Sequence, residues 1–290
     1  SKSLRIKVPR KADTPCNISM WVVDSQNTLG DPKNLKLTYT GGVAKPKLHL
    51  FAVGVSDYST ADGLSNLKYA SKDAKDFVNT ISSPNLYANL YSDVVTNIMT
   101  DEKATRYNVL DEMNKLVSNV GQEDVVVLFF SGHGVKEDSS GDTYYMAYNS
   151  EANAPYTGIN FSDIKKRIQT LTEQKNCRVL LFVDTCHAGS MYGMKGSTVE
   201  LSMKMPGFVG FYSSTSGQQS AELDNIQNGV FTSAILEALN GKAQAGEEGI
   251  TINSLEFYVK NRVKALTNNR QDAIVENSII GDAVIFGAKK

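Results

Sequence analysis

Short runs of consecutive apolar residues recur along the chain from residue 47 onward. Four of them lie at residues 48–55, 125–130, 178–183 and 208–212. A run of this length without polar alternation is typical of a parallel strand that is covered on both faces. We therefore predict four buried strands in this part of the chain.

Amphipathic stretches separate these runs. Apolar residues recur at helical spacing in residues 70–81 and 110–117, and later in 161–171, 230–239 and 255–266. Strands that alternate with helices are typical of a mostly parallel sheet flanked by helices. The pattern predicts an α/β fold of this kind.

The first 45 residues have a different pattern. Apolar and polar residues alternate at 4–8, 18–23 and 35–39, and turn-forming glycine and proline residues lie between these stretches. Alternation with a period of two indicates half-buried antiparallel strands. We interpret residues 1–45 as an N-terminal β segment, the end of an upstream domain or a linker, and residues 46–290 as the main domain.

Composition narrows the function classes. The chain has 290 residues, 41% of them hydrophobic, and a net charge of −1, so nothing in its overall charge favours nucleic acid or anionic membranes. No apolar run reaches the roughly 18 residues of a membrane span. Three cysteines and three histidines without paired spacing disfavour a disulfide framework and a zinc site. We expect a soluble protein, with the cytoplasm slightly favoured; a start at Ser1 is also compatible with a targeting segment ahead of it.

Two of the predicted strands run directly into polar motifs. Residues 131–134 read Ser-Gly-His-Gly, and residues 184–189 read Asp-Thr-Cys-His-Ala-Gly. Ligands of open α/β sheets bind beyond the carboxyl ends of the strands, so adjacent strands would bring His133 and Cys186 together. A thiol with a pKa of about 8.5 needs a nearby base to become a nucleophile. We predict Cys186 as the nucleophile and His133 as its base, with the amides of Gly134 and Cys186 forming the oxyanion hole.

The other cysteines and histidines have ordinary interpretations. A lone buried cysteine is usually an inert apolar residue, which is how we interpret Cys16 and Cys177, and His49 is assigned a structural role. His187 directly follows the nucleophile. Neighbouring side chains on an extended segment point in opposite directions, so His187 is disfavoured as the base.

Both motifs resemble those of the caspase–metacaspase superfamily, whose relatives include clostripain, the gingipains and legumain. The 53 residues that separate His133 from Cys186 match the caspase spacing of about 50. Residues 51–58 and 67–74 resemble the first strand and helix of bacterial members, and residues 228–232 resemble their late segment. This resemblance covers residues 47–286. It implies a cysteine endopeptidase that acts through a covalent thioester.

The resemblance also has implications for specificity. True caspases carry glutamine two residues before the nucleophile, whereas this chain carries Asp184, as metacaspases do. By the same resemblance, Asp73 and Ser131 belong to the substrate site. Two carboxylates and a hydroxyl suit a cation, which predicts cleavage after Arg or Lys, with Arg favoured if the carboxylates form a fork. Two plainer interpretations stay open: Asp73 as an acid favoured by the dipole of its helix, and Asp184 as a turn residue after a strand.

The segment after the nucleophile suggests processing. Residues 190–206 are rich in small and polar residues, and their only basic residues are Lys195 and Lys204. Related loops are often cut during activation, so self-cleavage at either lysine is one hypothesis. A substrate-binding loop that stays intact is the other. Likewise, Ser213 and Ser214 either line the substrate cleft or form a polar strand end.

Metals and partners are the last expectations. Many metacaspases need calcium, but residues 188–203 contain no aspartate, and the acidic stretch 137–142 is typical of a solvated hairpin turn. We expect no metal or other cofactor, a peptide or protein substrate, and a monomer, as in most metacaspases. The main rival is a catalytically silent scaffold that binds a partner in the same cleft. A nucleotide-binding domain is disfavoured because residues 54–57 lack the glycines and lysine of a phosphate loop.

Overall fold

The computed structural model describes residues 15–38, 45–59, 63–137, 139–151, 157–187, 205–214, 222–223, 226–243, 249–279 and 282–288. The chain divides into two compact units, Ser1–Lys45 and Pro46–Lys290. Within the described residues, no helix has the length and apolar character needed to cross a membrane.

The first unit contains an antiparallel pair of strands, β1 (Pro15–Met20) and β2 (Lys33–Thr38). The antiparallel pairing agrees with the prediction, but the expected half-burial is wrong. Met20 and Leu35 each expose 47% of their surface. A two-stranded sheet has no second layer of its own against which one face could be buried. The strand predicted at residues 4–8 lies outside the described residues.

The second unit is built on one mostly parallel sheet, which confirms the predicted fold class. Its path runs β13-β9-β8-β5-β3-β4, and all neighbours on this path are parallel except β13 and β9. The short strands β6 and β7 extend the sheet from the end of β5 by antiparallel pairing. The bounds are β3 (Leu48–Gly54), β4 (Val94–Thr100), β5 (Val125–Lys136), β6 (Thr143–Tyr145), β7 (Ile159–Asn160), β8 (Arg178–His187), β9 (Phe208–Tyr212) and β13 (Ile274–Asn277).

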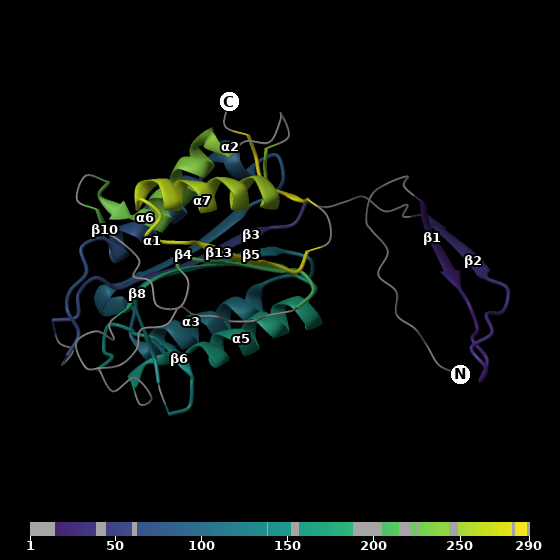
Figure 1. Cartoon of the computed structure of the whole chain (residues 1–290), viewed down its shortest axis with the longest axis horizontal. Coiled ribbons are helices and arrows are strands. Elements are labelled where there is room, and N and C mark those ends of the chain that lie inside the picture. Colours follow the sequence, from purple (N-terminus) through teal and green to yellow (C-terminus); the bar gives the residue numbers. More distant parts are fainter. Residues whose placement is uncertain are drawn as a thin grey trace. The chain divides into compact units, whose positions relative to one another are not determined.

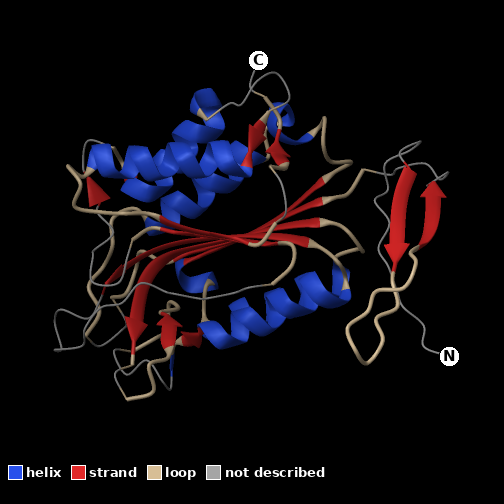
Figure 2. Cartoon of the chain, turned by 45° about the vertical axis from the view of Figure 1, so that its right-hand side comes forward, coloured by secondary structure: helices blue, strands red, loops and turns tan. Residues whose placement is uncertain are grey.

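Helices cover both faces of this sheet (Figures 1 and 2). One face carries α1 (Ala70–Ile81), α6 (Val230–Glu237) and α7 (Ile252–Leu266), and the other carries α3 (Arg106–Asn119) and α5 (Phe161–Gln169). Shorter elements complete the unit: α2 (Pro84–Tyr87), η1 (Asp101–Lys103), the π-helical turns η2 (Thr170–Gln174) and η4 (Ala238–Lys242), and the small strand pairs β10 (Glu222–Leu223) with β11 (Asn228–Gly229) and β12 (Ile250–Thr251) with β14 (Val284–Phe286).

Two hydrophobic layers explain why the strands read as continuous apolar runs. On β5, Val127 and Phe129 pack into the layer below α1, α6 and α7, whereas Leu128 and Phe130 pack into the layer above α3 and α5. Successive residues of a strand point to opposite faces, so both sets must be apolar when both faces are covered.

Strand order creates a topological switch point at the carboxyl ends of β3 and β5. These two strands are neighbours, but the chain leaves β3 toward α1 on one face and leaves β5 toward α5 on the other. Ligands of open α/β sheets bind at such a switch point. The segments that follow β3 and β5 are therefore the ones to search for a site.

Both strands that carry the motifs are longer than predicted. The apolar runs predict strand ends at residues 130 and 183, whereas β5 continues to Lys136 and β8 to His187. The polar motifs remain in the ladder because β5 and β8 pair with each other as far as Gly134 and His187, and β6 pairs with the end of β5. Ladder bonds do not depend on side-chain polarity, so apolar runs underestimate such strands.

Candidate active site

The register of β5 and β8 brings the two motifs side by side. Ser131 is paired with Asp184 and His133 with Cys186 along the parallel ladder. Neighbouring strands lie about 4.8 Å apart, so the backbones of His133 and Cys186 are direct neighbours. The side chains of Cys186 and His187 lie outside the described residues.

His133 is buried and held in one tautomer. Its Nε2 lies 2.7 Å from the carbonyl oxygen of Ser65, in the connection between β3 and α1. A carbonyl oxygen only accepts hydrogen bonds, so Nε2 carries the hydrogen, and the lone pair of the neutral ring is on Nδ1. The imidazole is thus oriented to take up a proton at Nδ1. The sequence predicts no third member of the site, because a backbone carbonyl leaves no signal in the sequence.

The hydroxyl of Tyr58 is inserted into the ladder beside His133. Tyr58 Oη accepts the N–H of His133 (3.0 Å) and donates to the carbonyl of Met146 (2.9 Å), while the N–H of Met146 donates to the carbonyl of His133 (2.9 Å). The phenol ring also packs on the imidazole at a centroid distance of 4.7 Å. A Cβ at Gly132 would lie 2.8 Å from Tyr58 Oη, which explains the glycine before the histidine.

Asp101 fixes the connection that carries Tyr58 and Ser65. One carboxylate oxygen accepts the backbone N–H groups of Ser56 (2.8 Å) and Asp57 (3.0 Å), and the other accepts the hydroxyl of Ser71 (2.6 Å). Ser71 belongs to the first turn of α1. A single carboxylate therefore joins the β3–α1 connection to the helix that carries Asp73.

Asp73, Asp184 and Ser131 meet beside Gly229. Both carboxyl residues are buried, with 2% and 3% of their surface exposed. A Cβ built on Gly229 would lie 2.6 Å from Asp184 Oδ2 and 3.1 Å from Asp73 Oδ2, and Ser131 Oγ lies 3.4 Å from Asp73 Oδ2. The structure thus brings together the three residues that the sequence analysis assigned to a cation site.

Close packing of α1 on β3 positions Asp73. A Cβ at Gly54, the last residue of β3, would lie 2.3 Å from the carbonyl oxygen of Ala70 and 2.8 Å from Cβ of Ala74. Only glycine allows the first turn of α1 to approach the strand this closely. Asp73, in that same turn, is therefore held next to the carboxyl end of the sheet.

The two acids bind the beginning of another helix. Asp73 accepts the side-chain amide of Asn228 (2.7 Å) and the N–H of Gly229 (3.2 Å), and Asp184 accepts both the hydroxyl (2.7 Å) and the N–H (3.2 Å) of Thr232. Asp73 also lies in the first turn of α1, so its interpretation as an acid favoured by the dipole of its helix stays open beside these contacts. From sequence, residues 228–232 carry only part of the family resemblance, and no role in the site is predicted for them.

Other singled-out residues have structural partners. His49 Nε2 lies 2.9 Å from Asp124 Oδ2, and burial raises the pKa of the Cys177 thiol to about 11, as expected for an unreactive cysteine. Ser213 and Ser214 are buried. The N–H of Ser213 donates to the carbonyl of Val183, and the side-chain amide of Gln271 donates to the carbonyl of Ser213.

The expectations on processing and metal binding stay predictions. Lys195 and Lys204 lie outside the described residues. In the acidic stretch 137–142, Glu137 accepts the hydroxyl of Ser140 (2.7 Å), and Asp142 accepts the amide of Asn160 (3.2 Å). No group of three or more potential metal ligands occurs in the part of the chain that is described. Calcium independence stays a prediction.

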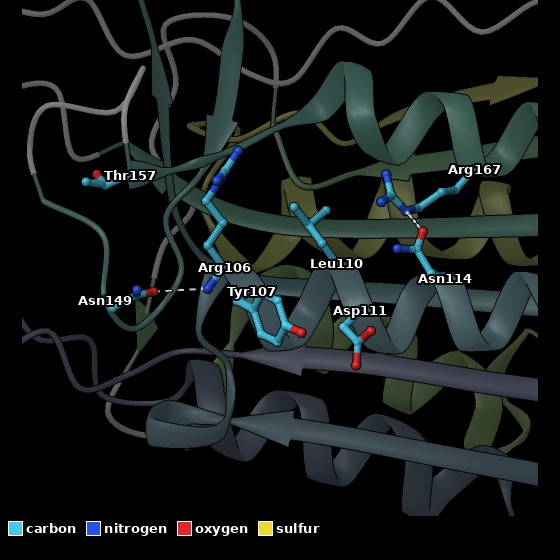
Figure 3. Close-up of a pocket in the computed structure, with 8 residues that line it drawn as sticks. All are labelled: Arg106, Tyr107, Leu110, Asp111, Asn114, Asn149, Thr157 and Arg167. Atoms are coloured by element: carbon cyan, nitrogen blue, oxygen red, sulfur yellow. Dashed lines mark hydrogen bonds between the residues drawn. The ribbon is translucent and has the colours of Figure 1, made fainter.

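A separate groove lies between α3 and α5 (Figure 3). It has a volume of about 480 Å³ and contains none of the predicted site residues. Neutral oxygen atoms hold its two arginines: Arg106 Nε donates to Gly158 (3.1 Å) and Arg167 Nε donates to Asn114 (3.0 Å). Its lining offers no nucleophile paired with a base, so the candidate site remains the carboxyl edge of the sheet.

Comparison with known proteins gives a consistent result for fold and family. The chain is similar to Metacaspase-1 of Schizosaccharomyces pombe, with 30% identity over 49% of this chain and 36% of the relative. It is also similar to Metacaspase-1 of Candida albicans (24% identity, 56% and 41%) and of Debaryomyces hansenii (23%, 77% and 52%). The chain thus spans about half or less of the length of these relatives.

A solved structure supports the fold. Protein GSU0716 from Geobacter sulfurreducens matches with a TM-score of 0.58 and 16% identity, over 83% of this chain and 96% of that one. The model of the caspase domain family matches residues 49–283, which include the whole of the described site. The motifs that resembled the caspase–metacaspase superfamily thus have the expected fold around them, and the chain belongs to the caspase domain family.

Proposed function

We propose that this chain is a cysteine endopeptidase in which Cys186 is the nucleophile and His133 is the base. The observation that carries this proposal is the pairing of His133 with Cys186 in the β5–β8 ladder, beside an imidazole that Ser65 and Tyr58 hold in place. Family membership supports the same chemistry, since caspase-like peptidases act on proteins or peptides.

The proposed reaction proceeds by acyl transfer. His133 Nδ1 takes the thiol proton of Cys186, and the thiolate adds to the carbonyl carbon of the scissile bond. Collapse of this adduct breaks the C–N bond, and the imidazolium gives its proton to the leaving amine, which leaves a thioester. Water, deprotonated by His133, then hydrolyses the thioester, releases the acid and regenerates the thiol.

Backbone amides are proposed to stabilise the oxyanion. The N–H and carbonyl of His133 bond Tyr58 and Met146 on the β6 side of β5. Backbone groups of successive strand residues alternate in direction, which favours a Gly134 N–H directed toward β8 and Cys186. The amides of Gly134 and Cys186 are our candidates for the oxyanion hole.

We propose Asp73, Asp184 and Ser131 as the group that selects a basic residue before the scissile bond. Two carboxylates facing one glycine concentrate negative charge at a buried position, and an Arg or Lys side chain supplies the matching charge. Leaving one member of a buried charge pair unmatched costs roughly 2–5 kcal/mol, which predicts at least about 30-fold discrimination.

A panel of fluorogenic peptides with Arg, Lys, Asp or Asn before the scissile bond tests the proposal. We expect hydrolysis of the Arg and Lys peptides by the wild-type protein and none by Cys186→Ala, whose fold is checked by circular dichroism. Faster cleavage of the Asp peptide would contradict the basic specificity, and residual cleavage by pure Cys186→Ala would contradict the nucleophile. Absence of turnover with every peptide would favour the silent scaffold.

Self-processing is a separate part of the proposal. Lys195 and Lys204 follow the nucleophile in sequence and match the proposed specificity. We expect intact-mass spectrometry to find fragments that end at one of these lysines in wild-type protein and an uncut chain in Cys186→Ala. Equal fragmentation of both proteins would assign the cleavage to a contaminant, and an uncut wild-type chain that hydrolyses peptides would rule out a processing requirement.

A further inference from the structure

Helix α6 begins between two carboxylates that belong to other elements. The first N–H groups of a helix have no partner within the helix, and a Ser, Thr, Asp or Asn at the N-cap usually accepts one of them. Here the N-cap is Gly229, which has no side chain to do so. Asp184 of β8 accepts the N–H of Thr232, and Asp73 of α1 accepts the N–H of Gly229. The acids of the proposed cation site therefore cap α6.

Two side-chain donors complete this arrangement. Asn228 Nδ2 lies 2.7 Å from Asp73 Oδ1, and Thr232 Oγ1 lies 2.7 Å from Asp184 Oδ2. These contacts are shorter than the 3.2 Å contacts from the two backbone N–H groups. Residues 228–232 thus supply each carboxylate with one backbone and one side-chain donor, in addition to the contact of Ser131 Oγ with Asp73. Hydrogen bonds to a charged acceptor are about twice as strong as neutral ones, so they fix the carboxylate orientation.

Gly229 leaves space between the two carboxylates. Its φ of −56° and ψ of 143° are open to any residue, so its backbone conformation does not require glycine. Its position does, because a Cβ there would lie 2.6 Å from Asp184 Oδ2 and 3.1 Å from Asp73 Oδ2. Any larger residue would push at least one carboxylate away from its donors.

We propose that Asn228, Gly229 and Thr232 determine specificity by holding Asp73 and Asp184 at a spacing and orientation that fit the guanidinium of an arginine substrate; this inference rests on the proposed function. Like charges that share one small space repel, and the positive end of α6, together with the donors of residues 228–232, offsets that repulsion. Fixed carboxylates favour the planar fork of Arg over the compact ammonium of Lys. These three are positioning residues, since they act through the two acids.

The test compares an arginine peptide with its neutral isostere, the citrulline peptide. Thr232→Val removes the shorter of the two hydrogen bonds that Thr232 donates to Asp184. We expect it to lower the Arg-to-citrulline ratio of kcat/KM about tenfold, through a higher KM for the arginine peptide. Thr232→Ser keeps the hydroxyl and should restore the ratio. The matched control is Thr172→Val, which changes a buried threonine whose hydroxyl bonds Ile168 and leaves the ratio at the wild-type value.

Gly229→Ala supplies an independent variant. Its backbone angles suit alanine, but the added Cβ would displace at least one buried carboxylate. We therefore expect a lowered thermal unfolding midpoint and, in the folded protein, an Arg-to-citrulline ratio lowered at least tenfold. If Thr232→Val and Gly229→Ala slow both peptides equally, their role is merely structural and the inference is overturned.

A binding measurement separates failure of this inference from failure of the proposed function. If the wild-type protein cleaves no arginine peptide, the proposed function fails, and calorimetry with agmatine, a small guanidinium compound, then tests the cation site in Cys186→Ala. We expect agmatine to bind, and to bind about tenfold more weakly when Thr232→Val is added. No binding, or binding that Thr232→Val leaves unchanged, overturns the inference.

Discussion

At the scale of single residues, Tyr58 is the group whose removal best tests how His133 is held. Tyr58→Phe deletes the oxygen that bonds the N–H of His133 and the carbonyl of Met146. Two buried backbone groups lose a partner, which we expect to lower the free energy of unfolding by about 2–3 kcal/mol. The imidazole should lose its fixed position, so we expect kcat for an arginine peptide to fall about tenfold, measured by initial rates at saturating peptide.

Tyr91→Phe is the matched control for that variant. Its hydroxyl is also buried and donates to a backbone carbonyl, that of Ile285 (2.7 Å), but Tyr91 precedes β4 and packs in the layer of α1, α6 and α7. A loss of stability without a loss of kcat is expected. Wild-type turnover in Tyr58→Phe would show that the hydroxyl has no bearing on the base.

These contacts also define what could be predicted about the site. His133, Cys186 and Asp184 lie in compact motifs that sequence alone singles out. Tyr58 and Ser65 precede His133 by 75 and 68 residues, and their contacts use a backbone N–H and a backbone carbonyl. Pairings of this kind depend on the path of the β3–α1 connection. Packing and the hydrogen bonds of Asp101 determine that path, so it cannot be predicted from the local sequence.

At the scale of elements, the sequence predicts interiors better than ends. Continuous apolar runs identify β3, β5, β8 and β9, because both faces of each strand are buried. Apolarity cannot show where pairing stops, and β5 and β8 keep pairing through their polar motifs. For α3, the apolar spacing begins at residue 110, yet the helix begins at Arg106. Its N-cap, Thr105, accepts the N–H of Asn108, and this capping bond adds a first turn in which Val109 alone is buried, too little for an apolar periodicity to show.

Helix α6 shows a second reason why the ends of an element cannot be predicted from its local sequence. The sequence at its start, Asn-Gly followed by apolar residues, is typical of a turn before a buried helix and contains no polar N-cap. The acceptors come from Asp73, more than 150 residues earlier, and from Asp184. Capping from outside the helix joins α1, β8 and α6 at one point. The two carboxylates that we propose select the substrate thereby also accept N–H groups at the start of α6, where the helix itself supplies no capping side chain.

At the scale of the whole molecule, Asp124 joins the segments at the start of two central strands, β3 and β5. Its carboxylate accepts the N–H of Lys47 (2.9 Å) and of Gly121 (2.9 Å) and contacts His49 Nε2 (2.9 Å). Burial opposes the charge and raises the pKa of Asp124. The hydrogen bonds from Lys47, His49 and Gly121 outweigh burial, so the pKa of Asp124 lies below its ordinary value of 3.8.

A lowered pKa in the folded state makes stability depend on pH in a defined direction. Asp124 binds a proton more readily in the unfolded chain, so its contribution is complete above the unfolded pKa of about 4 and is lost as pH falls through the lower folded pKa. Asp124→Asn should therefore lower the free energy of unfolding by about 2 kcal/mol at pH 7, as measured by urea denaturation. That difference should shrink between pH 4 and pH 2, since the protonated carboxyl and the amide are both uncharged. Asp93→Asn, a change at an exposed carboxylate before β4, should leave stability nearly unchanged throughout. A difference for Asp124→Asn that stays constant down to pH 2 would show that its charge does not stabilise the fold.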